Sequence, residues 1–373
     1  WSISEVHAVA DGGCVYTLPF AGTDDQGGSY EGGRVIVTTL TDEGISRLEL
    51  FPIGAIDDAL ARFQQLRTEA RPEAPAPTIE RAWTRLISAM NARDLASLHD
   101  THAETFVMHD ETVGRDFDRR EFLNSLREML TARPSGSFRR GRSVTLGRRH
   151  GVVEMVWSQT DTGPVETANW YPMRCDDNGR FVSAARFRDA ALLASLVRAE
   201  ELYLEDEAFG AEAEWSRHRL DLWRAFIADN EGDWDTWRSL VDPELVVVDR
   251  SALGWGEVDS GGVLERQQAL STVTHQHRRG IKSVAIDRDV VLVEVAGEGT
   301  STDGGRFEIA KWVIQVGTKY QEHFAADDSE EAARRFRELA DESRREGEAE
   351  VARSLERGTG LSNAYTEFYY QWL

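Results

Sequence analysis

Apolar residues recur at the spacing of one helical face in two stretches of the chain, residues 81–94 and residues 221–233. Positions i, i+3, i+4 and i+7 are apolar in the first stretch, a pattern typical of an amphipathic helix, and the second repeats it over its first turns. Trp83 and Trp223 hold the same place in each helix and lie 223 − 83 = 140 residues apart. The pattern therefore indicates an internal repeat of about 140 residues.

The segments that follow keep the same order in both copies. Second helices are predicted over 95–98 and 234–240, and third helices over 118–131 and 259–273. A short apolar strand lies between them in each copy, Phe106–Asp110 and Leu245–Asp249, and ends on polar residues. The rest of each copy consists of β-rich runs around polar turns, which predicts antiparallel strands that end near Phe187 and Phe324.

The repeat predicts how the chain divides. We expect the closing part of a unit over 1–70, complete units over 79–204 and 215–340, and a charged helical linker with the start of a further unit over 341–373. Residues 363–372 look like the first helix of that further unit. A linker is expected over 205–214.

Helices followed by a run of strands indicate an α+β fold with an antiparallel sheet. The unit resembles the nuclear-transport-factor-2-like superfamily, in its SnoaL-like branch of polyketide cyclases and ketosteroid isomerases. The residues that carry this resemblance are the helices of Trp83 and Trp223, with 91–94 after the first, and the strands 106–110, 245–250 and those of Trp170 and Trp312. It implies tandem cone-shaped units, each with three helices packed on a strongly curved, mostly antiparallel sheet.

The same resemblance implies a biological context. Arrays of such units resemble the C-terminal regions of actinobacterial multidomain regulators, and a chain that opens at Trp1 is interpreted as a fragment. Family members often pair through their sheets, so neighbouring units are expected to form an intramolecular pseudo-dimer.

Composition narrows the partners. The chain has 43 basic and 65 acidic residues, a net charge of −22, which disfavours nucleic acid and anionic membranes. No apolar run approaches the ~20 residues of a membrane helix, and no signal peptide is recognisable. Two cysteines, Cys14 and Cys175, form no disulfide framework, so we expect a cytoplasmic protein.

The polar pair at the end of the first strand is the first candidate for chemistry. It is His109 with Asp110 in one copy and Asp249 with Arg250 in the other. A carboxylate beside an apolar cavity would have a raised pKa and could move protons, so Asp110, His109 and Asp249 are candidate catalytic residues. Alternatively, each aspartate satisfies the amides of a turn.

The second candidate is a strand on which a glutamate and a tryptophan share one face. Glu166 and Trp170 alternate in this way, as do Glu308 and Trp312. If this face lines the cone, both side chains belong to a pocket; if it points outward, they are a solvated charge and a packing aromatic. The candidate ligand-binding residues are Trp83, Trp157, Glu166, Trp170, Trp223, Arg250, Glu308 and Trp312.

Other motifs add little. His99 and His102 have possible metal spacing on a helix, but no zinc signature exists and no metal is predicted. His275 and His277 are expected in an exposed loop. The sequence has no phosphate-binding glycine loop, dinucleotide fingerprint or nucleophile elbow, so we expect no cofactor.

Three functions remain open at this point. The first is a non-catalytic module that binds a small hydrophobic ligand or packs on partner domains. The second is an enzyme that performs cofactor-free acid–base chemistry on a cyclic ketone or polyketide. The third is a scaffold whose cones are filled.

Overall fold

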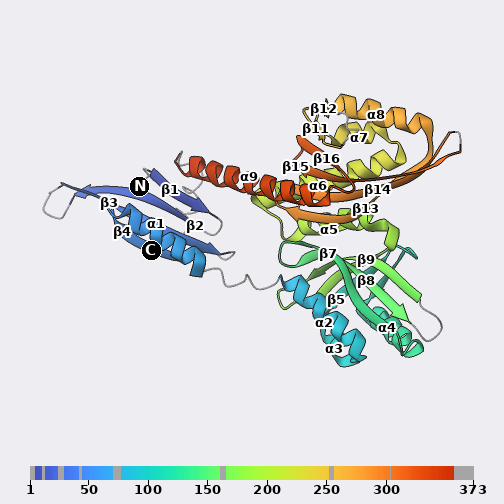
Figure 1. The fold of residues 1–373 in the computed structure, drawn as a ribbon. Helices are drawn as coiled ribbons and strands as arrows, with labels where there is room; N and C mark the ends of the chain where they lie inside the picture. Colours follow the sequence, from blue (N-terminus) through green and yellow to red (C-terminus); the bar gives the residue numbers. More distant parts are fainter. Residues whose placement is uncertain are drawn as a thin grey trace. The chain divides into compact units, whose positions relative to one another are not determined.

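The computed structural model describes residues 5–10, 13–23, 29–41, 44–69, 77–159, 165–251, 256–302 and 304–356. The chain divides into two compact units, one of residues 76–340 and the other of residues 1–75 with residues 341–373. The described strands form three separate sheets (Figure 1). No helix in these ranges is long and apolar enough to cross a membrane.

The larger unit repeats one arrangement twice, as the first cone and the second cone. The first cone contains α2 (Thr78–Ala92), α3 (Leu95–Asp100), α4 (Arg119–Ala132), β5 (His102–Asp110), β6 (Arg115–Asp118), β7 (Ser137–Leu146), β8 (His150–Gln159), β9 (Val165–Cys175) and β10 (Phe181–Arg188). The second contains α6 (Gly210–Glu231), α7 (Trp234–Leu240), α8 (Ser260–Val273), β11 (Val246–Asp249), β12 (Gly256–Asp259), β13 (Thr274–Asp287), β14 (Val290–Ser301), β15 (Arg306–Val316) and β16 (Tyr320–Ala325).

Both sheets have the same topology. Their strand orders are β6-β5-β10-β9-β8-β7 and β12-β11-β16-β15-β14-β13. Neighbouring strands are antiparallel except in the pairs β5–β10 and β11–β16, which are parallel. The α+β fold predicted from the sequence is thereby confirmed, with three helices packed on a curved, mostly antiparallel sheet in each copy (Figure 1).

The turn between the first two helices shows why the two copies fold alike. Arg93 (φ 57°) and Gly232 (φ 69°) adopt the left-handed conformation that ends the first helix of each cone. Asp94 and Asp233 then cap the second helix. In both cones the capping carboxylate accepts a hydrogen bond from the backbone N–H three residues later, at 3.1 Å.

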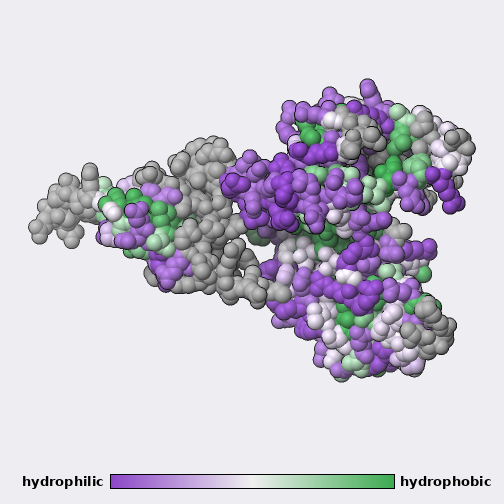
Figure 2. Space-filling model, in the orientation of Figure 1, coloured by the Kyte–Doolittle hydropathy of each residue, from purple (hydrophilic) through white to green (hydrophobic). Residues whose placement is uncertain are grey.

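A helix that follows the last strand covers the outer face of each sheet, the face that points away from the cone interior. In the first cone this helix is α5 (Leu192–Asp206), which comes after the short 3₁₀ turn Asp189–Ala191. In the second cone it is the first part of α9 (Ser329–Glu356). Figure 2 shows that the exposed surface over α9 is strongly hydrophilic. Leu192 and Leu196 of α5 pack on Trp170 and Phe187 of the first sheet. Ala332 and Leu339 of α9 pack on Ile314 and Phe324 of the second sheet.

The linker predicted over 205–214 is mostly helical, because α5 and α6 follow each other almost directly and only 207–209 lie between them. One expectation about the chain path is wrong. His275 and His277 lie in β13, not in a loop, and the backbone of His275 pairs with that of Thr300. The prediction missed this part of β13 because a strand that extends beyond the apolar core no longer shows apolar alternation.

Helix α5 also joins the two cones through a buried polar cluster. Glu200 is fully buried and accepts hydrogen bonds from Ser216 (2.5 Å) and Arg219 (2.6 Å), both on α6. A second Arg219 N–H donates to the carbonyl of Arg288, in the turn between β13 and β14. A buried charge is costly unless it is paired, so this cluster fixes how α5 and α6 meet.

The smaller unit contains a four-stranded antiparallel meander followed by a helix. Its elements are β1 (Glu5–Ala10), β2 (Gly13–Thr23), β3 (Ser29–Thr41), β4 (Gly44–Pro52) and α1 (Ile56–Glu69). Val35 and Phe63 lie in the apolar cluster between the sheet and α1. The order of four strands and a helix is that of β7–β10 and α5 in the first cone.

Candidate functional site

The interiors of the two cones can be compared position by position through their strand registers. Trp170 pairs with Phe187 in the first sheet, and Trp312 pairs with Phe324 in the second. Successive side chains of a strand alternate between the two faces, so these pairs fix which residues point into each cone. Three interior positions differ in size or polarity: Met155, Tyr171 and Met173 in the first cone correspond to Val295, Val313 and Gln315 in the second.

The interior of the first cone is packed with apolar side chains. Trp83 and Leu86 of α2 meet Phe106 and Met108 of β5 in one buried cluster, which also contains Met155. Burial raises the pKa of the Tyr171 hydroxyl to about 12. Methionine and aromatic side chains fill irregular space well, which explains why this interior is a core.

The interior of the second cone contains a cavity of about 90 Å³. The shorter side chains of Val295 and Val313 form part of its wall. Its apolar lining also includes Leu222, Ala225, Phe226, Trp237, Leu240, Val241, Leu245 and Val263. The cavity therefore lies where the first cone has its methionine and tyrosine side chains, between the sheet and helices α6, α7 and α8.

Polar groups converge on this cavity from two sides. From α6 come His218 and Asp221, and burial raises the pKa of the Asp221 carboxyl. From the sheet come Lys311 and His323, whose Nζ and Nδ1 atoms lie 3.2 Å apart, and Gln315. A carboxyl group with a raised pKa opposite cationic or donor groups, in a partly apolar cavity, is an arrangement that can bind a polar molecule or move a proton.

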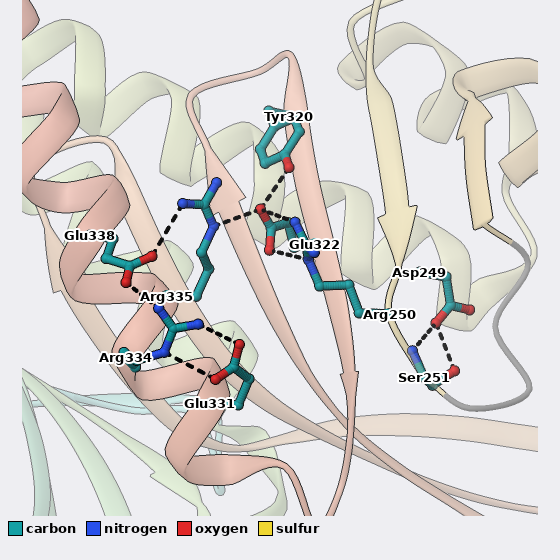
Figure 3. A network of polar contacts seen from close by, with 9 residues as sticks. All are labelled: Asp249, Arg250, Ser251, Tyr320, Glu322, Glu331, Arg334, Arg335 and Glu338. Carbon is teal, nitrogen blue, oxygen red and sulfur yellow. Dashed lines mark hydrogen bonds and ion pairs between the residues drawn. The ribbon is translucent and has the colours of Figure 1, made fainter.

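The strand-end aspartates both make the same turn contact. Asp110 accepts hydrogen bonds from the backbone and hydroxyl of Thr112, at 2.9 and 2.6 Å. Asp249 accepts the equivalent bonds from Ser251, at 3.0 and 2.7 Å (Figure 3). Asp110 is also buried and ion-paired with Arg186. These contacts correspond to the turn alternative considered for both aspartates.

The neighbours of these aspartates point away from the cone interiors. His109 and Asp110 lie on opposite faces of β5, so their side chains point apart. His109 is half exposed and contacts Asp116 and Glu111; the hydrogen bond to Asp116 raises its pKa. Arg250 binds Glu322 at 2.8 Å on the outer side of β16 (Figure 3).

The strands with a glutamate and a tryptophan present these side chains on the outer face of each sheet. Glu166 is exposed and ion-paired with Arg139 at 2.8 Å, while Trp170 packs under α5 and donates a hydrogen bond to a backbone carbonyl at 2.9 Å. Glu308 is also exposed, and Trp312 packs under α9. This is the outward-facing alternative for both strands.

The remaining candidate residues make packing contacts or local hydrogen bonds. Trp83 and Trp223 are fully buried in apolar clusters under their sheets. Trp157 is half-buried, and the guanidinium of Arg133 lies 4.7 Å from its ring centre. His102 is buried at the start of β5, where its Nδ1 lies 2.9 Å from the carbonyl oxygen of Leu98. Within the described ranges, no group of three or more His, Cys, Asp or Glu residues could hold a metal ion.

Sequence reasoning missed His218, Asp221 and Lys311. A signal for the first two existed in the sequence, because they lie three residues apart and next to an apolar helical face. Lys311 directly precedes Trp312, so alternation places it on the opposite, interior face of β15. What the sequence did not reveal was which face of that strand lines the cone.

No protein-family model and no curated protein matches the chain. Among solved structures, a loop-truncation variant of IdmH is 24% identical, covers 31% of this chain and 98% of its own, and has a TM-score of 0.28. A SnoaL-like protein of unknown function from Burkholderia thailandensis is 15% identical, with 30% and 94% covered and a TM-score of 0.25. An NTF2-like protein of unknown function from Cytophaga hutchinsonii is 11% identical, with 33% and 98% covered and a TM-score of 0.25. Each of these likenesses covers about a third of this chain.

Proposed function

We propose that the second cone binds a small polar molecule, and that the first cone is a filled structural partner. The observation that carries this proposal is the cavity in the second cone, at the positions where the first cone has large side chains. The polar groups of Asp221, Lys311 and His323 border this cavity. In the first cone, Asp110 is bound by Arg186 and Thr112.

The volume and lining define the ligand class. Pockets for drug-sized ligands measure roughly 300–1,000 Å³, whereas a water molecule occupies about 30 Å³. A cavity of about 90 Å³ therefore suits a molecule of a few heavy atoms. The Lys311 ammonium can donate a hydrogen bond to a carbonyl or carboxylate oxygen, while Phe226 and Val313 offer apolar contacts. We infer a short-chain carboxylate or a small ketone.

Thermal unfolding with small carboxylates and ketones tests this proposal. Propionate, butanone and cyclopentanone should each be titrated against the full chain. A ligand at a hundredfold excess over its Kd should stabilise the folded chain by about 2.7 kcal/mol. The matched control is Val313→Tyr with Gln315→Met, which gives the second cone two of the three larger interior residues of the first.

The control separates a specific site from surface binding. The double variant should unfold at the same temperature as the parent chain, or higher, and should lose the ligand response. A flat response of the parent chain to all the compounds, or an equal response of the double variant, would contradict the proposal.

A second candidate function is proton transfer, favoured by the raised pKa of Asp221 inside the cavity. The Asp221 carboxylate would take an α-proton from a ketone, and the Lys311 ammonium would donate a hydrogen bond to the oxygen of the resulting enolate. Return of a solvent proton would complete the exchange without a cofactor.

Deuterium exchange at the α-carbon of cyclopentanone, followed by NMR in D₂O, tests this reaction. The parent chain should accelerate the exchange, and Asp221→Asn should lose the acceleration with little change in melting temperature. Asp110→Asn is the matched control in the filled cone and should keep it. Exchange at the buffer rate in the presence of the parent chain would leave binding without chemistry.

We also propose that the two cones form the internal pseudo-dimer expected from the resemblance, within a larger regulatory protein. Supporting this, α5 contributes to an apolar cluster with side chains of both cones, and Glu200 binds Arg219 of the second. Glu200→Ala should convert a single unfolding transition into two. A single transition in that variant would count against a pseudo-dimer held by this joint.

A further inference from the structure

One face of the N-terminal sheet is buried although the helix α1 lies on the other face. Val15 and Val35 point toward α1, so their neighbours on the same strands point away from it. These neighbours are nonetheless buried, with exposed fractions of 9% for Cys14, 2% for Tyr16, 5% for Ile36 and 3% for Thr38. Since α1 cannot reach this face, another segment must cover it.

The strand register identifies this face as a cone interior. Val35 pairs with Phe51, as Trp170 pairs with Phe187 in the first cone. Both Val35 and Trp170 lie under the helix that follows the last strand, α1 or α5. The opposite face of β2 and β3 therefore corresponds to the face of β8 and β9 that the first helix, α2, covers.

The burial of the N-terminal sheet is what a single helix at the position of α2 would produce, without a helix at the position of α4. In the first cone α2 packs over β7 and β9, and α4 packs over β5 at the other side of the sheet. In the N-terminal sheet, the residues of β2 and β3 are buried, whereas Leu48 and Leu50 of β4 are 44% and 59% exposed on the same face. Figure 2 shows hydrophobic side chains at the surface of this unit.

The chain contains a segment with the matching pattern, and this segment belongs to the same compact unit. Residues 341–373 cluster with residues 1–75. Within them, apolar residues recur at the spacing of the first helix of each cone. Tyr365, Phe368, Tyr369 and Trp372 repeat the intervals of Trp83, Leu86, Ile87 and Met90. Residues 357–373 lie outside the described ranges, so their helix is inferred from this sequence pattern.

We propose that residues 363–372 form the first helix of a third cone and dock on the face of the N-terminal sheet that carries Cys14 and Ile36. The two ends of the chain then build one unit together. In the first cone, Trp83 lies against Gly151, and the register places Cys14 at the position of Gly151. In this arrangement Tyr365 takes the position of Trp83. The smaller tyrosine ring would then contact Cys14, whose side chain needs more room than Gly151.

Disulfide trapping in the full chain tests this contact. With Tyr365→Cys, mild oxidation by copper phenanthroline and oxygen should join the Cys14 thiol to the thiol introduced at position 365 of the same chain, releasing two protons and two electrons to the oxidant. Thr366→Cys is the matched control, because Thr366 corresponds to the exposed Thr84 of α2. Non-reducing gels should show a shifted monomer for the first variant and none for the second.

Thiol reactivity provides a second measurement that needs no new cysteine. Phe368→Asp with Trp372→Asp should raise the reaction rate of Cys14 with a thiol reagent at least about tenfold, as a buried thiol becomes exposed. Cys175 is buried inside the first cone and serves as the internal control, since its rate should stay constant. An unchanged Cys14 rate, equal trapping by Thr366→Cys, or a disulfide between two chains would overturn the proposal.

Discussion

The first and second cones share a framework and differ in what fills it. Their strand orders, parallel pairs, helix caps and strand-end aspartate turns coincide. Inside, the first cone has Met155 and Tyr171 where the second has Val295 and Val313, and the second contains a cavity. A pocket can thus arise in this fold through a few shorter side chains, while the strand order stays the same.

The residues that lie beneath the outer helices α5 and α9 also differ between the two cones. Ala185 of β10 packs among apolar side chains beneath α5. Its counterpart on β16 is Glu322, which is fully buried and binds Arg250, Arg335 and Tyr320 beneath α9 (Figure 3). At this outer position the first cone therefore has a small apolar residue, whereas the second has a buried charged network.

The largest effect is expected from emptying the filled cone. Phe106→Ala removes a fully buried ring from the first core and should lower the free energy of unfolding by about 3–5 kcal/mol. Leu245→Ala changes the corresponding residue of the second cone, which already borders the cavity, and should cost less. Urea denaturation of both variants measures the difference.

Equal losses of unfolding free energy for Phe106→Ala and Leu245→Ala would contradict the proposed difference between the two cones. They would mean that the space beside Leu245 contributes nothing to how the second cone responds to truncation. A larger loss for Leu245→Ala would mean that the second cone is the better packed of the two.

The next effect concerns Glu322. Burial acts to raise its pKa, but hydrogen bonds from Arg250, Tyr320 and Arg335 bring the pKa below its ordinary value of 4.5. A depressed folded-state pKa adds stability that is present above the unfolded value and lost as the pH falls below about 4.5. Glu322→Gln leaves two guanidinium groups without their carboxylate and should cost about 3 kcal/mol at neutral pH.

Melting temperatures between pH 3 and 7 check this expectation. The variant should lose stability at pH 7 and show a flatter decline below pH 4.5 than the parent chain. Ala185→Ser, at the matching position of the first cone, should leave the acid decline unchanged. If the parent and Glu322→Gln declined in parallel, folding would not lower the pKa of the Glu322 carboxyl.

The framework was predictable from the sequence because it depends on local chemistry. Trp83 and Trp223 mark the same helix, and Asp94 and Asp233 follow as its caps. The interior chemistry was not predictable. Whether Glu166 or its neighbour Thr167 faces the cone depends on where the sheet places its helices, and one residue of register reverses the answer.

The candidate site shows the same limit. Asp110 and Asp249 are conspicuous in the sequence because they end an apolar strand, yet their turns hold both. Asp221 lies on a helix with an ordinary amphipathic sequence pattern. It becomes a candidate site residue only because it lines the same cavity as Lys311 and His323. Such contacts between distant segments are set by tertiary packing.

The buried histidine of the first cone, His102, should make the stability of the chain depend on pH. Burial lowers the pKa of His102 from 6.5 to about 4, so it is neutral when folded. A folded-state pKa below the unfolded one gives stability that is complete above pH 6.5 and is lost as the pH falls toward 4. The loss should reach about 3 kcal/mol near pH 4. The second cone has Val241 at this position.

His102→Val should therefore remove this pH dependence while changing stability little at pH 7. Denaturation in urea between pH 4 and 7 gives the comparison, and Val241→Leu, at the matching position of the second cone, serves as the control that keeps the slope. A parent chain whose stability is constant from pH 6.5 to 4 would show that His102 is protonated in the folded state.

The smallest effect is expected at the helix caps, where the two cones should behave alike. Asp94→Ala and Asp233→Ala each remove the side chain that accepts a hydrogen bond from the first turn of the second helix. Hydrogen bonds to Ser97 and Thr236, respectively, lower the pKa of the two exposed carboxylates, so the caps act while ionised. Each substitution should lower the melting temperature slightly, by the same amount, and only above pH 4. A clear difference between the two falls would mean that the cones differ in framework as well as in interior.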